Sequence, residues 1–151
     1  CNTINGNTLC LFQLVEKHGK ILYDGMKEKE NVYFVYGGTD TDHREKIRGL
    51  VEGHNKSTTI ASYGTFSTGI NIRNINNIVL ASPSKSKIRV LQSIGRGLRT
   101  SSTKDSILIF DIADDISYKD RRNFTLNHFF ERLNIYNEQQ FNYEISKVRI
   151  K

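Results

Sequence analysis

Four side chains near residue 90 have the types and spacing needed for chemistry on a phosphate group. They share one face of a helix, because intervals of three, four and three residues separate them. They are Arg89, Gln92, Arg96 and Arg99. Arginine stays protonated at working pH, and its planar fork matches two phosphate oxygens at once. Facing a cleft, such a row is suited to a nucleotide phosphate chain; the alternative is a solvated charged face, which is common for surface arginines.

A helix over residues 85–98, after the break at Ser82-Pro83, is predicted to carry this row. Apolar or small residues recur at the same intervals, one position out of phase: Ile88, Leu91, Gly95 and Leu98. One face of the helix is therefore expected to pack on the protein while the neighbouring face is cationic.

A phosphate-binding P-loop is not indicated elsewhere in the chain. The pair Gly19-Lys20 resembles its end, but the motif needs glycine where Leu14 stands and serine or threonine where Ile21 stands. The sequence also has no Asp-Glu-x-His motif, the acidic motif that holds Mg²⁺ beside a P-loop. A complete nucleotide-hydrolysing centre is therefore not expected within this chain alone.

Strands and helices are predicted to alternate along the chain. Short apolar or β-branched runs predict strands at residues 8–13, 32–36, 58–62, 78–81 and 107–112. Helices are predicted at residues 19–29, 42–53 and 85–98. This alternation indicates an α/β fold with a doubly wound parallel sheet, in which loops at the carboxyl ends of the strands form the site.

Three local features refine this picture. Asp42 and Glu45 have the spacing of a helix capping box. Residues 62–72 are rich in glycine, serine and threonine, which favours a functional loop over an ordinary helix. The strand at 107–112 is apolar on both faces, as buried parallel strands are.

The composition changes near residue 117, so we divide the chain into a domain at 1–116 and an extension at 117–151. The extension begins with a basic connector and continues with an aromatic stripe that predicts an amphipathic helix. Phe141, Tyr143 and Ile145 then alternate with polar residues, as in a half-exposed strand. Aromatic residues at these spacings are more often core than nucleic-acid contacts, and both interpretations stay open.

The overall composition is that of one globular domain with a basic balance. The 151 residues carry a net charge of +6 and a pI near 9.4, which favours a polyanionic partner such as nucleic acid. Cys1 and Cys10 have no metal-ligand spacing, so no metal site is expected. No apolar run is long enough to span a bilayer, so we expect a cytoplasmic protein with no membrane partner. The start at Cys1 suggests that residues precede this chain.

The motifs together resemble a known family. Residues 60–72, closing on Gly69-Ile70-Asn71, and residues 92–99, of the form Gln-x-x-Gly-Arg-x-x-Arg, look like motifs V and VI in the second RecA-like lobe of superfamily 2 helicases. The stretches at 61–69 and 138–143 look more narrowly like the UvsW-type phage DNA helicases, and the resemblance covers nearly the whole chain. It implies a RecA-like fold of the P-loop NTPase kind.

The resemblance also implies roles for individual residues. Arg96 and Arg99 would be arginine fingers that reach the ATP bound, with Mg²⁺, mainly by an N-terminal RecA-like lobe of the same full-length protein. Gln92 would couple that contact to hydrolysis. The nucleotide cleft would be lined by Gly69, Asn71 and Gly95. The family has an acidic residue where Asn71 stands, so Asn71 is either a nucleotide contact without the charge or a turn cap.

Such a lobe is also expected to grip a DNA strand by its backbone. The candidate contacts are Gly38, Ser62, Thr65, Lys85 and Arg89. The sequence therefore predicts the C-terminal motor lobe of an ATP-dependent DNA helicase or translocase that acts on branched DNA in recombination, repair or replication restart. The alternatives are a non-catalytic nucleic-acid-binding module with the same fold, an RNA helicase lobe, or a restriction-type translocase lobe.

Overall fold

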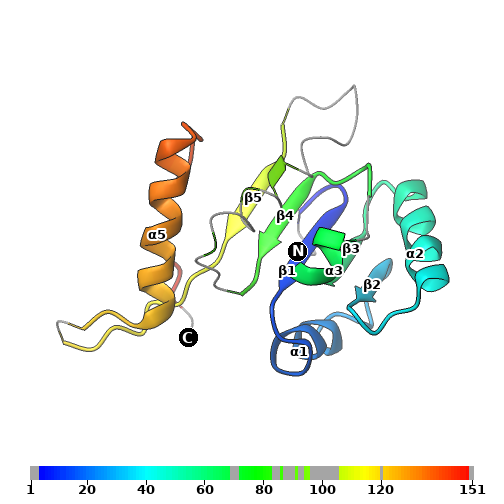
Figure 1. The fold of residues 1–151 in the computed structure, drawn as a ribbon, viewed down its shortest axis with the longest axis horizontal. Coiled ribbons are helices and arrows are strands. Elements are labelled where there is room, and N and C mark those ends of the chain that lie inside the picture. Colours follow the sequence, from blue (N-terminus) through cyan, green and yellow to red (C-terminus); the bar gives the residue numbers. More distant parts are fainter. Residues whose placement is uncertain are drawn as a thin grey trace.

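The structure, a computed structural model, describes residues 4–68, 72–82, 86, 91, 94–95, 106–119 and 121–149. Within these residues the chain forms a five-stranded, all-parallel sheet with helices packed on both of its faces (Figure 1). The doubly wound α/β class predicted from the sequence is confirmed. The boundary placed between residues 116 and 117 stays a prediction.

The five strands follow one another in the predicted order, and the helix predicted over residues 85–98 lies mostly outside the described residues. The strands are β1 (Thr8–Phe12), β2 (Val32–Val35), β3 (Thr58–Ser62), β4 (Asn77–Leu80) and β5 (Leu108–Asp111). The helices are α1 (Lys20–Asp24), α2 (Thr41–Gly53), α3 (Tyr63–Thr68) and α5 (Phe124–Glu138), and a π-helical turn, η1 (Val15–Gly19), precedes α1. The strand order is β2-β3-β1-β4-β5, so the chain crosses from one side of β1 to the other between β3 and β4. In sheets of this kind, ligands bind outside the carboxyl ends of the strands at such a switch point.

β1 is the centre of the sheet, and all five of its residues are buried. It pairs with β3 on one side and β4 on the other, with Leu9 opposite Thr59 and Ile78. Because side chains alternate along a strand, Leu9 and Leu11 enter one core cluster while Cys10 and Phe12 enter the cluster on the opposite face. This burial on both faces explains the continuous apolar run seen in the sequence.

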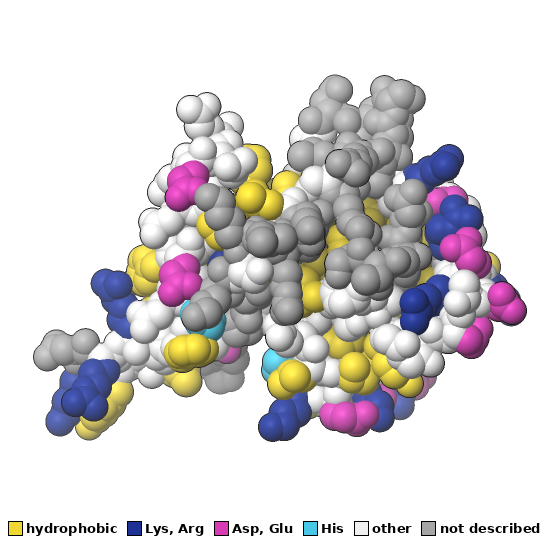
Figure 2. Space-filling model, in the orientation of Figure 1, with side chains coloured by type: hydrophobic (Ala, Val, Ile, Leu, Met, Phe, Trp, Pro, Cys, Tyr) yellow, Lys and Arg dark blue, Asp and Glu magenta, His cyan; other side chains and the backbone are white. Residues whose placement is uncertain are grey.

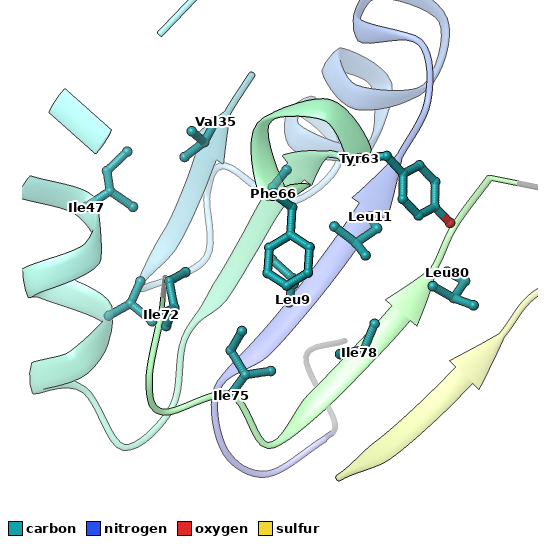
Figure 3. Close-up of a cluster of buried hydrophobic side chains, with 12 residues drawn as sticks. Leu9, Leu11, Val35, Ile47, Tyr63, Phe66, Ile72, Ile75, Ile78 and Leu80 are labelled. Carbon is teal, nitrogen blue, oxygen red and sulfur yellow. The ribbon is translucent and has the colours of Figure 1, made fainter. Parts of the chain in front are cut away.

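The larger core cluster lies between the sheet and helices α2 and α3 (Figure 3). Helix α2 contributes Ile47 and Val51, and α3 contributes Phe66. Helix α2 begins two residues earlier than the capping box predicts: Asp40 is the N-cap, and its Oδ1 accepts the backbone N–H of His43 at 2.8 Å. The capping-box prediction is therefore wrong, since the backbone of Asp40 is extended and its carboxylate satisfies the helix start.

The opposite face of the sheet is covered by η1 and α1. The predicted helix over 19–29 is shorter in the structure, and Ile21, expected on its apolar face, is 66% exposed while Leu22 and Met26 pack toward the sheet. Gly19 is required where η1 meets β1, because a Cβ atom there would lie 2.5 Å from the ring of Phe12. The π-helical turn therefore brings the chain into direct contact with the centre of the sheet.

β5 and α5 form the other side of the molecule (Figure 1). Within the part of the chain that the structure describes, β5 is an edge strand that pairs with β4, and Leu108 is 55% exposed. The prediction of a strand buried on both faces is therefore wrong for β5. The predicted helix of the extension is confirmed as α5. The strand predicted around Phe141 to Ile145 is not formed, because described residues 141–149 have no regular secondary structure.

Candidate functional site

The carboxyl ends of the parallel strands bring the predicted loops to one edge of the sheet. Gly37-Gly38 follows β2, Ser62 ends β3, and Ser82 follows β4, as the alternation of elements predicts. β1 lies between β3 and β4, so the switch point falls where β1 ends at Phe12. We therefore describe this carboxyl edge, residue by residue, as the candidate site.

Gly38 sits in a tight turn that joins β2 to α2. A Cβ atom at Gly38 would lie 2.7 Å from the ring of Tyr36, so the close approach of backbone to ring requires glycine. The turn is closed by the backbone N–H of Thr39, which donates to the Tyr36 carbonyl at 2.9 Å, and Arg44 donates to the Gly37 carbonyl at 2.9 Å. The backbone is thus held in place at this edge. A nucleic-acid contact at Gly38 stays a prediction.

Ser62 and Thr65 are brought together, but by a local structure that the sequence did not predict. Residues 63–68 form α3, so the prediction of a loop without an ordinary helix is wrong for this part. The Ser62 hydroxyl accepts the backbone N–H of Thr65 at 3.3 Å and lies 2.7 Å from its hydroxyl, which is a helix N-cap. Both side chains are buried. Their hydroxyls are paired in this arrangement, and their predicted phosphate contacts stay predictions.

Ser82 is the centre of a polar cluster at the switch point that sequence reasoning missed. Its Oγ accepts the backbone N–H of Gln13 at 3.2 Å and lies 2.7 Å from Nδ1 of His18. Its carbonyl accepts the hydroxyl of Tyr63 at 3.3 Å. Ser82 is 2% exposed; its bond with Tyr63 is buried, and its bonds with Gln13 and His18 are partly buried. The Ser82 cluster (Gln13, His18, Tyr63 and Ser82) therefore ties the ends of β1, β3 and β4 together.

Most of the predicted phosphate-binding side chains lie outside the described residues. These are Gly69, Asn71, Lys85, Arg89, Gln92, Arg96 and Arg99. We call residues 92–99 the arginine segment, and within it the structure describes Ile94 and Gly95. A Cβ atom at Gly95 would meet no other atom within 4 Å, so close packing does not explain this glycine. Its predicted place in the nucleotide cleft stays a prediction.

Ile94 joins the arginine segment to the C-terminal extension. It is buried to 4% exposure and packs in one cluster with Leu133 and Tyr136 of α5 and with Ile109 of β5. Leu91 and Gly95, which were predicted to belong to the apolar stripe, are only partly buried. Ile94 is not part of the predicted stripe, whose other two members, Ile88 and Leu98, lie outside the described residues. Its partner surface is α5, a contact that helical periodicity does not reveal.

Asp111, at the carboxyl end of β5, holds α5 in place. Arg132 donates through Nε to Oδ2 and through Nη2 to Oδ1 of Asp111, both at 2.7 Å, and the Tyr136 hydroxyl donates to Oδ2 at 2.7 Å. Burial disfavours the charge of Arg132, but the hydrogen bonds and charge of Asp111 outweigh it and raise the pKa of Arg132. The pKa of Tyr136 is also raised, by burial and by the charge of Asp111. Both groups therefore stay protonated, and the Asp111 cluster (Asp111, Arg132 and Tyr136) is a buried, bidentate ion pair with a third donor.

Charges elsewhere on the described surface are mixed. Over α2, cations and acids lie side by side (Figure 2), with Arg48 paired to Glu45 at 2.8 Å and to Glu52 at 3.5 Å. In the described part of the chain, no three His, Cys, Asp or Glu side chains gather in a group that could hold a metal ion. Among the described helices, none is both long enough and apolar enough to cross a bilayer.

The fold and the edge described above are those of a RecA-like helicase lobe. Residues 1–101 match the family described as the helicase conserved C-terminal domain, and the chain belongs to this family. The chain is 36% identical over 155 residues to the ATP-dependent DNA helicase uvsW of Enterobacteria phage T4, covering 95% of this chain and 31% of that protein. It is 31% identical over 102 residues to the putative ATP-dependent helicase IRC3 of Saccharomyces cerevisiae, covering 67% of this chain and 15% of that protein.

Solved structures agree with these sequence relationships. The crystal structure of T4 UvsW superimposes with a TM-score of 0.79 at 35% identity, over 95% of this chain and 31% of that chain. S. cerevisiae Dbp5 bound to RNA and ADP BeF3 superimposes with a TM-score of 0.62 at 16% identity, over 87% of this chain and 32% of that chain, which supports the fold alone. The chain thus spans about a third or less of these relatives. The resemblance predicted from motifs V and VI is confirmed.

Proposed function

We propose that this chain is the C-terminal motor lobe of an ATP-dependent DNA helicase or translocase that acts on branched DNA. The observation that carries the proposal is the 36% identity to an ATP-dependent DNA helicase over 95% of the chain. The placement of Gly38, Ser62 and Ser82 on one edge of a RecA-like sheet supports it, because that edge is where such sheets bind ligands.

In this proposal the arginine segment supplies positive charge to a nucleotide held mainly by an upstream lobe. Phosphoryl transfer requires positioning and charge stabilisation more than covalent help from protein groups. Arg96 and Arg99 would place guanidinium groups against phosphate oxygens, and Gln92 would couple this contact to hydrolysis. ATP would supply the transferred phosphoryl group and its negative charge. Mg²⁺ and the arginine side chains would neutralise this charge. The ligands of Mg²⁺ are assigned to the upstream lobe, because the sequence of this chain contains neither a P-loop nor an Asp-Glu-x-His motif.

The second task of the lobe is to grip the DNA backbone. Turns with fixed backbone N–H groups, such as the one at Gly38, suit phosphate contacts that position a strand without reading its sequence. Lys85 and Arg89 would add charge-assisted contacts to the same backbone. Ser62 and Thr65 would have to exchange the hydrogen bond between their hydroxyls for one to phosphate, so we expect their contribution to be smaller.

The test is DNA-stimulated ATP hydrolysis by the full-length protein with Arg96→Ala. We expect kcat to fall on the order of a thousandfold or more while DNA binding is kept, because an arginine finger acts in the transition state. Arg73→Ala is the matched control, since Arg73 is an exposed arginine that precedes β4 at the opposite edge of the sheet. Residues 1–151 alone should show no Arg96-dependent hydrolysis. Turnover of Arg96→Ala within tenfold of the wild type would refute the finger assignment.

A further inference from the structure

The C-terminal extension packs against Ile94 of the arginine segment, and two buried residues of α5 belong to the same cluster. Ile94 is 4% exposed, Leu133 is 9% exposed and Tyr136 is 7% exposed, and the three pack in one cluster. Ile94 precedes Arg96 by two residues. Because only Gly95 separates Ile94 from Arg96, we expect a change in how Ile94 is held to alter the position of the proposed finger.

Tyr136 takes part in two kinds of contact at once. Its ring packs in the cluster with Ile94, and its hydroxyl donates to Oδ2 of Asp111 at 2.7 Å. Asp111 is the last residue of β5, so the hydroxyl fixes the ring relative to the sheet. Tyr136 therefore connects the position of the arginine segment to the end of a strand.

The ion pair with Arg132 fixes the orientation of α5. Arg132 is 1% exposed, and its guanidinium meets Asp111 through two hydrogen bonds of 2.7 Å. A buried ion pair adds little net stability compared with well-packed apolar side chains, because both charges lose water. A bidentate pair does constrain geometry, since both bonds form only at one angle between the groups. The Asp111–Arg132 pair therefore sets the direction of α5.

A groove lies beside α5, so the direction of this helix depends on the hydrogen bonds of the Asp111 cluster. A groove of about 820 Å³ runs along β5, α5 and residues 140–146, and its lining includes Ile94, Leu133 and Tyr136. Figure 2 shows hydrophobic side chains at the surface between α5 and the sheet. Beside this groove, the three hydrogen bonds of Asp111 tie α5 to the end of β5 and so help to hold the helix against Ile94.

We infer that α5 positions the arginine fingers: Leu133 and Tyr136, oriented by the Asp111–Arg132 pair, are positioning residues for ATP hydrolysis that act through Ile94. This inference rests on the proposed function, because it assigns α5 a role in the same reaction. It also gives the extension a function other than nucleic-acid binding. The extension is then part of the motor lobe rather than an appendage to it.

The test compares variants in the full-length protein by DNA-stimulated ATP hydrolysis. Leu133→Ala is expected to lower kcat by about 10- to 100-fold, with KM for ATP changed less than about twofold, because a displacement of about 1 Å at a reacting group has an effect of this size. Tyr136→Phe keeps the ring and removes the bond to Asp111, and it is expected to lower kcat by a smaller factor. Leu133→Met should restore most of the rate. Phe124→Ala, on the same helix but at a residue that is 71% exposed, is the matched control.

A second measurement separates positioning from general damage to the fold. In the Arg96→Ala background, measured by single-turnover hydrolysis, Leu133→Ala should cause no further loss, because its effect passes through Arg96. An equal loss in both backgrounds, or a kcat unchanged by Leu133→Ala and Tyr136→Phe, would overturn the inference. If Arg96→Ala itself leaves turnover intact, the finger assignment in the proposed function fails. If Arg96→Ala abolishes turnover and the α5 variants leave it intact, the inference alone fails. Near-ultraviolet circular dichroism selects variants that remain folded, and if Leu133→Ala does not fold, Tyr136→Phe decides.

Discussion

The centre of the sheet and its edge at β5 hold their buried polar groups in different ways. At the switch point, Ser82 links three strand ends through hydrogen bonds that include no ion pair. At the edge of the sheet, Asp111 holds α5 through a buried ion pair with Arg132 and a further bond from Tyr136. The Ser82 cluster sits at the end of β1, which is buried on both faces, whereas the Asp111 cluster borders an open groove.

This difference indicates which interactions carry stability in each region. The centre of the sheet gains its stability from apolar side chains that leave water on both faces, and its polar bonds only adjust the loops. The extension buries fewer apolar side chains, so the ion pair decides where α5 lies. Losing one partner of an ion pair leaves a charge buried, and losing one partner of a neutral bond does not.

The largest effect in this comparison is expected from Arg132→Met. The substitution leaves the Asp111 carboxylate, with a side chain only 9% exposed, without its cation. We expect the free energy of unfolding to fall by about 3 to 5 kcal/mol, measured by urea unfolding followed by circular dichroism. The double variant Asp111→Leu with Arg132→Met should regain most of this loss, because no charge remains buried. A double variant as unstable as the single one would show that apolar packing, not charge, limits this side of the sheet.

A smaller effect, confined to alkaline pH, is expected from Cys10 at the centre of the sheet. Burial raises the pKa of the Cys10 thiol from 9.0 to about 11. Between these values the unfolded chain loses the proton and the folded chain keeps it, so stability falls as the pH rises from about 9 to about 11. The loss attributable to Cys10 should reach about 2 kcal/mol at pH 11 and vanish below pH 8.

The measurement is the pH dependence of urea unfolding for the wild type and for Cys10→Ala. The difference in unfolding free energy between the two proteins should shrink by about 2 kcal/mol between pH 8 and pH 11. Tyr136→Phe provides the comparison with the other side of the sheet, because burial also raises the pKa of Tyr136. A Cys10→Ala difference that stays constant with pH would mean that the thiol is accessible to water at the centre of the sheet.

Much of the fold was predictable because it depends on local patterns. The alternation of apolar runs and helical stripes predicts all five strands and their order along the chain. The aromatic stripe of the extension predicts α5 through Phe124, Phe129, Phe130, Leu133 and Tyr136. Helix α3 was missed because its sequence has weak helix propensity. In the structure the Ser62 cap and the burial of Tyr63 and Phe66 favour it instead.

The contacts that build the site depend on partners far apart in the sequence. His18 and Ser82 are 64 residues apart, and Asp111 and Arg132 are 21 residues apart, so no short motif contains either pair. The exposure of β5 depends on strand order, which an apolar run does not encode. The family resemblance identified the arginine segment, but the burial of Ile94 against α5 follows only from the packing of the extension.

The smallest effect is expected from Ser82→Ala, which tests the hydrogen bonds of the Ser82 cluster at the centre of the sheet. The change removes the acceptor of the Gln13 N–H and the partner of His18 Nδ1, while the carbonyl that receives the Tyr63 hydroxyl remains. We expect a loss of about 1 kcal/mol, since a buried neutral hydrogen bond contributes about this much and no charge is left behind.

Urea unfolding of Ser82→Ala beside the exposed control Ser146→Ala measures this loss. A value near that of Arg132→Met would contradict the contrast between the two clusters, because a neutral anchor would then be as important to the fold as an ionic one. The stability loss of Ser82→Ala can also be compared with its effect on kcat. A stability loss near 1 kcal/mol, together with a larger rise in the activation free energy of hydrolysis, would show that Ser82 mainly sets where the chain leaves β4. Residues 83–91, which connect β4 to the arginine segment, begin at that point, so the central cluster and α5 would then constrain the arginine segment from its two sides.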